Sequence, residues 1–322
     1  MWSKSLMSKY DISIIDVSNL FYRAAAGLDD KSTADKVSDA TKRFERFIDT
    51  QAMTKEKVYL CFDPMADSFE QKNLKSFDTA SSFRQGLVPT YKTDRNGKDT
   101  ATFNAVVHNI YQKYCFECKF ENVFVHHDIR YEADDYVKSI INDPLNAGKK
   151  FIFCSADSDW AKYLQYGDMM KTGLSTELPK NIWTAADFQA KEGRHFGFVP
   201  TESSVTFDFV FDGDQHNNVP GVFHLPDIKI MRSTAKAILS TIHENYKLSL
   251  GEMTYDILNE AGPFEDCMKC LRLSQSAKIY HKVIESVKAH LDVINPREDL
   301  QLNETICRKI TLNDFTKKKI KL

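Results

Sequence analysis

Acidic residues recur at five places in the chain, and four of these places lie at or after the end of an apolar, strand-like segment. The residues are Asp16, Asp63, Glu132, Asp134, Asp135, Asp157, Asp159 and Asp214. Carboxylates brought together repel one another, so a fold that gathers this many at one sheet edge needs divalent cations to neutralise them. Oxygen ligands with few accompanying His or Cys residues favour Mg²⁺ or Mn²⁺. The chemistry expected of such a site is metal-assisted hydrolysis of phosphodiesters, in which the metal activates water.

Each cluster also has an ordinary structural explanation, because acidic residues stabilise helix N-termini. Glu132 and Asp135 are three residues apart at the start of a predicted helix, so they share one face. Asp157 and Asp159 could equally cap a helix that starts at Ser158. Capping explains any single cluster, whereas the recurrence of five clusters favours a metal site.

The segments that must position these acids alternate between strand and helix patterns. Apolar, β-branched runs predict strands at 11–16, 57–62, 121–126 and 149–154. Apolar positions with a helical period predict helices at 19–26, 35–52, 100–114 and 132–142, and a short helix from Ser158. This alternation is typical of an α/β domain with a mainly parallel central sheet flanked by helices. Asp16, Asp63 and Asp157 then fall at the carboxyl edge of the sheet, where such domains place their functional crevice.

Two further regions lie outside this alternation. Residues 64–99 are polar and aperiodic, which predicts a long loop or arch beside the site. After Pro200, helical patterns return at 203–212, 232–246, 251–261 and 276–290. We therefore expect an α/β domain over 1–200, a helical region over 201–295 and a basic C-terminal tail over 296–322.

The composition argues against several classes of protein. The 322 residues are 42% hydrophobic and 12% aromatic, which argues against extensive disorder. No apolar run approaches the roughly 18 residues of a membrane span, and the N-terminus lacks an apolar signal segment, so we expect a cytoplasmic protein. The net charge of −2 is a weak argument against a nucleic-acid partner, because the acidic clusters conceal a positive remainder.

Six motifs in collinear order resemble the 5′ nuclease (flap endonuclease) superfamily, most closely its T-even bacteriophage ribonuclease H members. The motifs are Ile15–Asn19, Cys61–Asp63, Phe83–Arg95, Tyr131–Asp135, Ser155–Asp159 and Gly213–Val222. The resemblance implies a PIN-like α/β domain with two Mg²⁺ sites, in which Mn²⁺ can substitute. It also implies a C-terminal helical region with a degenerate helix–turn–helix element that binds duplex.

The same resemblance divides the acids between two metals. The first metal would be held by Asp16, Asp63, Asp134 and Asp157. The second would be held, partly through water, by Glu132, Asp135, Asp159 and Asp214. The family's closing motif has a second Asp where this chain has Asn217, whose amide can ligate through its oxygen or orient a metal-bound water but brings no charge. We therefore expect a weaker second site.

Basic residues in the predicted arch match those that contact the scissile phosphate in the family. Arg84, Lys92 and Arg95 are expected in this catalytic role, because a cation there can clamp the transferring phosphoryl group. Tyr91 is expected to stack on a base, and Lys98 to bind nucleic acid. The alternative is a solvated loop with scattered positive charges.

After Gly221 the family has a helix–turn–helix element that grips the duplex backbone, often with a bound K⁺. This chain lacks the second glycine-bearing turn of that element, so the existence of a K⁺ site stays open. Phosphate ligands remain at Lys229, Arg232, Ser233, Thr234 and Lys236. An ordinary amphipathic helix is the alternative.

The activity implied is hydrolysis from the 5′ ends of RNA–DNA and DNA duplexes, as in primer removal during phage replication, with flap cleavage as a further activity. The expected partners are such duplexes and, through the basic tail, a single-stranded DNA-binding protein; we expect a monomer. Two alternatives stay open. One is a replication accessory protein that binds nucleic acid without efficient cutting, and the other is a PIN-type ribonuclease that cuts single-stranded RNA.

Overall fold

A six-stranded sheet forms the centre of the computed structural model, which describes residues 9–64, 80–92, 100–117, 119–192, 200–202, 204–205, 209, 212–214, 217–221 and 300. The strands are β1 (Ile12–Asp16), β2 (Lys57–Cys61), β3 (Val123–His126), β4 (Phe151–Cys154), β5 (Gly167–Met170) and β6 (Ile182–Trp183). They lie in the order β3-β2-β1-β4-β5-β6. The first five in this order are parallel, and the short β6 pairs antiparallel with β5.

The strand order creates a topological switch point between β1 and β4. From β1 the chain moves outward to β2 and β3, and it then returns to the other side of β1 for β4 and β5. In open α/β sheets, ligands bind beyond the carboxyl ends of the strands at such a point. Asp16 ends β1 and Asp157 follows β4 by three residues, so both lie there.

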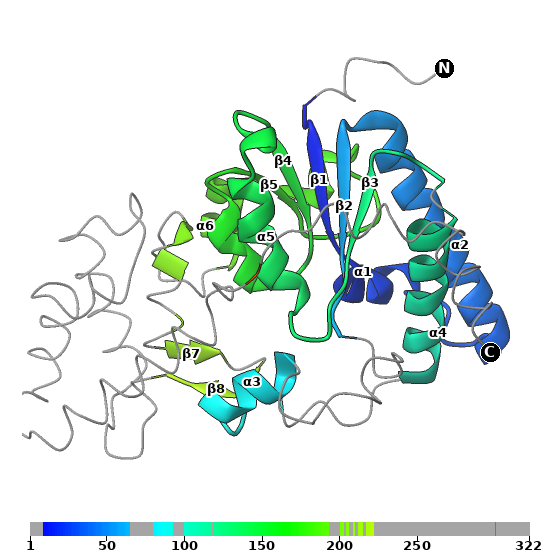
Figure 1. The fold of residues 1–322 in the computed structure, drawn as a ribbon, viewed down its shortest axis with the longest axis horizontal. Coiled ribbons are helices and arrows are strands. Elements are labelled where there is room, and N and C mark those ends of the chain that lie inside the picture. Colours follow the sequence, from blue (N-terminus) through cyan, green and yellow to red (C-terminus); the bar gives the residue numbers. More distant parts are fainter. Residues whose placement is uncertain are drawn as a thin grey trace, which may run out of the picture.

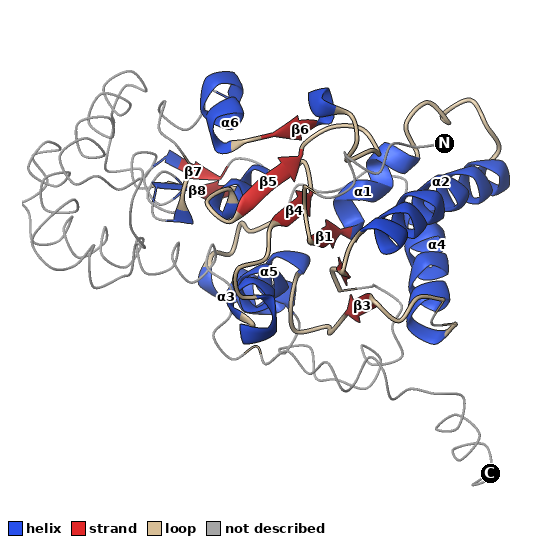
Figure 2. Ribbon diagram, turned by 90° about the horizontal axis from the view of Figure 1, so that it is seen from above, coloured by secondary structure: helices blue, strands red, loops and turns tan. Residues whose placement is uncertain are grey.

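Helices cover both faces of the sheet (Figure 2). One face carries α1 (Val17–Ala24), α2 (Thr33–Thr54) and α4 (Thr100–Tyr111), which continues as the π-helical turn η1 (Gln112–Phe116). The other face carries α5 (Ala133–Asn142), the 3₁₀ helix η3 (Ser158–Tyr163) and α6 (Ala185–Glu192). Two short 3₁₀ turns, η2 (Pro144–Asn146) and η4 (Pro179–Asn181), complete the connections. The predicted α/β fold with a mainly parallel sheet is confirmed.

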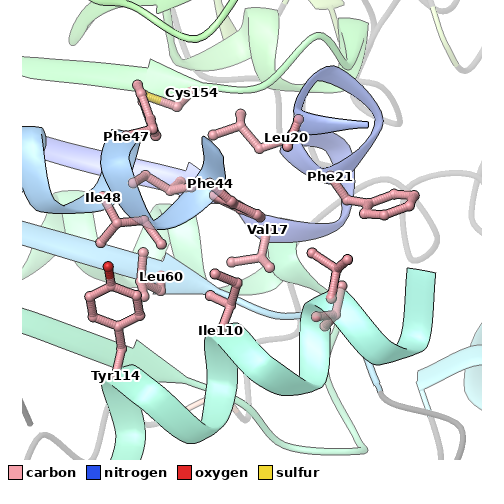
Figure 3. Close-up of a cluster of buried hydrophobic side chains, with 14 of the residues drawn as sticks. Val17, Leu20, Phe21, Phe44, Phe47, Ile48, Leu60, Ile110, Tyr114 and Cys154 are labelled. Atoms are coloured by element: carbon pink, nitrogen blue, oxygen red, sulfur yellow. The ribbon is translucent and has the colours of Figure 1, made fainter. Parts of the chain in front are cut away.

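Strand β1 sends apolar side chains into both helical layers. Ile14 joins the cluster on the α5 side and Ile15 joins the cluster on the α2 side, and neither is exposed to solvent. Figure 3 shows the cluster on the α2 side, in which Phe44 of α2, Ile110 of α4 and Leu60 of β2 are buried together. Because the central strands are buried on both faces, their sequences are almost continuously apolar, which made them predictable.

The segment 64–99, predicted as a long loop or arch, contains the helix α3 (Ala80–Leu87), which was not predicted. Val88 and Tyr91, which follow α3, pack against Val219 in a small buried cluster. Val219 belongs to a two-stranded antiparallel hairpin of β7 (Gly213–Asp214) and β8 (Val219–Pro220), which was not predicted. Figure 1 shows α3 beside this hairpin.

The hairpin depends on glycine at position 213. Gly213 has a φ of +83°, which side chains rarely permit. A Cβ atom there would lie 2.3 Å from the backbone nitrogen of Gly221 and 2.5 Å from the carbonyl oxygen of Val219. The close pairing of β7 with β8 therefore excludes any larger residue.

Most of the predicted C-terminal region is not described. The predicted helices at 232–246, 251–261 and 276–290 lie outside the described residues, as does all of the tail 296–322 except residue 300. In the part of the chain that is described, no helix is both long and apolar enough to cross a membrane.

Candidate active site

Asp16 is fixed by hydrogen bonds from both sides of the switch point. It caps α1, because its Oδ1 accepts from the backbone N–H of Asn19 at 2.9 Å. Its Oδ2 accepts from the hydroxyl of Ser155, in the loop after β4, also at 2.9 Å. Asn19 Oδ1 in turn accepts from the backbone N–H of Ala156 at 2.8 Å. The loops after β1 and β4 are thus joined around a carboxylate that is 5% exposed.

Asp63 and Asp134 attach the start of α5 to its surroundings. Asp63, two residues beyond β2, accepts through Oδ1 from the backbone N–H of Ala133 at 3.0 Å. Asp134, in the first turn of α5, accepts the indole N–H of Trp160 from η3. The α5 N-terminus is therefore held between the loop after β2 and the helix after β4.

Asp157 is the N-cap of η3, as the structural alternative predicted. Its Oδ1 accepts from the backbone N–H of Asp159 at 3.2 Å. Its own backbone N–H donates to Ser155 Oγ at 3.0 Å. Capping orients a carboxylate without excluding metal ligation, because each carboxylate has two oxygens and about four acceptor positions.

The acids at this edge act on one another electrostatically. Burial raises the pKa of Asp16 well above its usual value, and the charges of Asp63 and Asp134 raise it further. Burial, followed by the charge of Asp157, raises the pKa of Asp134 to about 7. The same two causes in the same order raise the pKa of Asp159. Asp16, Asp134 and Asp159 therefore ionise less readily than free carboxylates do.

The donor set has the chemistry that a hard divalent cation requires. It consists of buried carboxylates whose raised pKa values a cation would lower. Among the described residues, however, no three acidic, imidazole or thiol side chains stand close enough together to enclose an ion. A bound cation would have to draw the carboxylates closer together.

Glu132 and Asp135 are already paired with cationic side chains. Arg84 of α3 donates to Asp135 at 2.7 Å and lies 3.6 Å from Glu132. Lys92 Nζ donates to Glu132 at 2.7 Å, and the hydroxyl of Tyr91 donates to it at 2.8 Å. Burial alone would raise the pKa of Glu132, but Lys92 and Arg84 lower it to about 2. The protein's own cations therefore hold Glu132 ionised.

Burial rules out a solvated loop at the described end of the arch. Arg84 and Tyr91 are each 3% exposed. The carboxylate of Asp135 also accepts from the backbone N–H of Glu132 at 2.8 Å, so it caps α5 while it binds Arg84. Arg84 therefore bridges α3 and the N-terminus of α5.

The β7–β8 hairpin adds Asp214 to the same group of acids. Asp214 contributes to the raised pKa of Asp159. Its Oδ1 accepts from the backbone N–H of Asn217 at 3.2 Å, and its Oδ2 accepts from the Asn217 side-chain amide. Both residues are 6% exposed. The hairpin thus brings an acid from far along the chain to the carboxyl edge of the sheet.

No protein-family model and no curated protein matches the sequence. The structure aligns with a bacteriophage T5 flap endonuclease, solved as a pseudo-enzyme–product complex with DNA and metal ions, with a TM-score of 0.55 and 15% identity. That alignment covers 96% of this chain and 97% of the other. The same T5 protein co-crystallised with metal ions aligns with a TM-score of 0.54 and 14% identity, over 92% and 90% of the two chains.

The chain has the 5′ nuclease fold. At these identities the likeness concerns the fold, and it confirms the PIN-like architecture that the six motifs implied. Within this 5′ nuclease fold, the structure places the nine predicted metal ligands at or next to the carboxyl edge of the sheet. They are Asp16, Asp63, Glu132, Asp134, Asp135, Asp157, Asp159, Asp214 and Asn217. Their roles as ligands remain predictions.

Of the residues predicted to act in catalysis or to bind nucleic acid, other than the metal ligands, the structure describes three. Arg84, Lys92 and Tyr91 lie against Glu132 and its neighbour Asp135. The others lie outside the described residues and remain predictions: Arg95, Lys98, Lys229, Arg232, Ser233, Thr234 and Lys236.

Sequence reasoning assigned no role to three residues that orient the acids. Asn19 and Ser155 both bind Asp16, and Trp160 binds Asp134. Asn19 could have been found, because it stands three residues after an acid that ends a strand, which is a helix-capping spacing. Ser155 and Trp160 contact acids on other elements, so local spacing carried no signal for them.

Proposed function

We propose that the chain is a divalent-metal-dependent phosphodiesterase that acts on nucleic acid from 5′ ends, as a 5′→3′ exonuclease and flap endonuclease with ribonuclease H-like activity. The observation that carries this proposal is the set of buried carboxylates at the switch point, whose pKa values are raised by burial and by one another. Such a set favours a bound cation, and the cations that carboxylates select are those that assist phosphodiester hydrolysis.

The residues would divide their work as the resemblance implies. One metal would be held by Asp16, Asp63, Asp134 and Asp157, and a second by Glu132, Asp135, Asp159 and Asp214. When bound, Mg²⁺ or Mn²⁺ lowers the pKa of its water and offsets charge on the leaving oxygen. The hydrogen bonds from Asn19 and Ser155 orient Asp16 in advance, which reduces the reorganisation needed on binding.

The second site would be the weaker one for a structural reason. Its proposed ligands Glu132 and Asp135 are paired with Lys92 and Arg84, so a cation must compete with these side chains. The Lys92 side chain is 17% exposed, whereas that of Arg84 is 3% exposed. Lys92 is therefore the better candidate to leave Glu132 and contact a phosphate.

We further propose DNA and RNA–DNA duplexes with 5′ ends or flaps as substrates, with primer removal in phage DNA replication as the role. Two observations support duplex binding: the sequence motifs, and the fold shared with a flap endonuclease that was solved with DNA and metal ions. We also propose that the predicted basic residues outside the described part bind nucleic acid. The chain is proposed to be a monomer with a single-stranded DNA-binding protein as partner.

A substrate panel tests the proposal and separates it from its alternatives. The full chain is incubated with Mg²⁺ and 5′-labelled flap DNA, an RNA–DNA duplex with a recessed 5′ RNA, and single-stranded RNA. We expect cleavage of the flap and the duplex from the 5′ side, and a rate about 100-fold lower for Lys92→Met because a cation at the phosphate is lost. Cleavage of single-stranded RNA alone would indicate a PIN-type ribonuclease, and binding without cleavage an accessory protein.

A further inference from the structure

Hydrogen bonds of Asn217 tie different parts of the site together. Its backbone N–H and its side-chain amide both donate to the carboxylate of Asp214, on separate oxygens. Its carbonyl oxygen accepts from the backbone N–H of Lys92 at 2.8 Å. One residue of the hairpin turn therefore contacts both a proposed metal ligand and the residue that carries the proposed phosphate-binding amine.

The side-chain contact requires a donor. The carboxylate of Asp214 accepts hydrogen bonds, so the amide nitrogen of Asn217 must face it. A carboxylate at position 217 would place two anions in direct contact at a point where each residue is 6% exposed. Like charges at that separation and burial raise the pKa of one partner strongly and destabilise the pair unless a cation intervenes.

The backbone contact holds Lys92 in an unusual conformation. Lys92 has a φ of +54°, in the left-handed region that non-glycine residues seldom occupy. The hydrogen bond to Asn217 supports this conformation, and the hydroxyl of Thr90 adds a second link to the turn by donating to the carbonyl of Asn218 at 2.6 Å. In this conformation Lys92 Nζ reaches Glu132 at 2.7 Å. The turn and the end of the arch are thus positioned as one unit.

We propose that Asn217 is a positioning residue and not a metal ligand: its amide holds Asp214 in place of a cation, and its carbonyl holds Lys92 over Glu132. This inference rests on the proposed function only in naming Asp214 a ligand. It implies that, at the second site, the neutral amide of Asn217 stands where a second carboxylate would bring a negative charge. The metal-free protein is then more stable, and it gains less from added metal, than a chain with two acids in the hairpin.

The test is thermal unfolding of the full chain in EDTA, followed by titration with Mn²⁺, for wild type, Asn217→Asp and the exchanged double variant Asp214→Asn/Asn217→Asp. We expect Asn217→Asp to lower the melting temperature in EDTA by about 3–6 °C, since a charged hydrogen bond is replaced by repulsion. The exchanged variant restores an amide–carboxylate pair and should recover most of this loss. Saturating Mn²⁺ should raise the melting temperature of Asn217→Asp by more than that of wild type.

Three results would overturn the inference. One is an unchanged or higher melting temperature of Asn217→Asp in EDTA. Another is an exchanged variant as unstable as the single variant, and the third is an equal Mn²⁺ response in Asn217→Asp and wild type. If Asn217→Asp does not fold, the exchanged variant decides: folding supports the positioning role of Asn217, and failure to fold contradicts it. Unfolding in EDTA involves neither nucleic acid nor cleavage, so a failure of this positioning role is distinguishable from a failed nuclease assignment.

Discussion

At the residue scale, the acids at the site fall into two electrostatic classes. Glu132 has a pKa lowered to about 2, because Lys92 and Arg84 outweigh its burial. Asp134 has a pKa raised to about 7 by burial and by Asp157. Side-chain cations of the protein stabilise the charge of Glu132. The charge of Asp134 is disfavoured by burial and by Asp157, so an added cation would stabilise it. The proposed binding of a divalent ion is therefore favoured more by the charges on the Asp134 side than by those around Glu132.

The raised pKa of Asp134 predicts how metal affinity depends on pH. An acid whose folded-state pKa lies above its unfolded value makes the metal-free protein less stable as pH rises, here between about pH 4 and 7. Metal binding must displace the proton, so Mn²⁺ affinity should be about tenfold higher at pH 8 than at pH 6. Isothermal titration at both pH values measures this. Asp134→Asn should bind Mn²⁺ more weakly and with a flatter pH dependence, and a wild-type affinity that falls as pH rises would show that Asp134 does not lose its proton on metal binding.

The buried His126 is expected to make the folded protein less stable as pH falls, whereas Asp134 makes it less stable as pH rises. His126 is 5% exposed, stacks between Tyr59 and Tyr136, and has a pKa lowered to about 4 by burial. Because the unfolded chain binds a proton between pH 6.5 and 4 while the folded chain does not, stability falls as pH drops through this window. We expect wild type to lose about 2 kcal/mol more than His126→Phe between pH 7.5 and pH 5. Urea unfolding of the two proteins measures the difference, and parallel losses would rule the explanation out.

At the element scale, α3 and the residues that follow it connect parts of the site that are distant in sequence. Arg84 joins α3 to α5, and the backbone N–H of Lys92 joins the same segment to the β7–β8 hairpin. The buried cluster of Val88, Tyr91 and Val219 lies between these two links. The described end of the arch is therefore a structural part of the site as well as a source of positive charge.

This connection predicts that two arch cations differ in their effect on stability. Arg84→Met should destabilise the protein by about 3–5 kcal/mol, because it leaves buried Asp135 without its cation. Lys92→Met should cost about 1 kcal/mol or less, because Glu132 keeps Tyr91 and Arg84 as partners. Guanidinium unfolding in EDTA gives both values. An equal or reversed order would show that Arg84 does not hold α3 to α5.

Across the whole molecule, the sequence predicted strands β1 to β4 far better than it predicted β5, β6 and α3. Strands β1 to β4 lie within one or two residues of their predicted ends, because their apolar runs leave little choice. Strand β5 was missed because Gly167–Met170 has only two apolar side chains and a glycine, and β6 has two residues in all. Helix α3 was missed because the surrounding segment has no clear period.

The residues of the site likewise could be predicted only in part from the sequence. The topology could be expected to bring Asp16, Asp63 and Asp157 to one edge, because parallel strands end there together. The pairing of Arg84 with Asp135 joins residues 51 positions apart and depends on how α3 packs, which no local pattern encodes. The two-sided contact of Asn217 is of the same kind, since it depends on a hairpin that the sequence did not suggest.

In the proposed function, the carboxylates at the switch point hold a divalent cation that assists the hydrolysis of nucleic acid. The most direct test is the cleavage rate of a 5′ flap DNA in Mg²⁺ and in EDTA, for wild type, Asp157→Asn and Asp39→Asn. Asp39 is an acid on α2 that pairs with Lys31 and serves as the matched control. We expect cleavage by wild type and Asp39→Asn in Mg²⁺, none in EDTA, and a loss of at least about 100-fold in Asp157→Asn. Cleavage that persists in EDTA, or that is equal in Asp157→Asn and wild type, would contradict the claim.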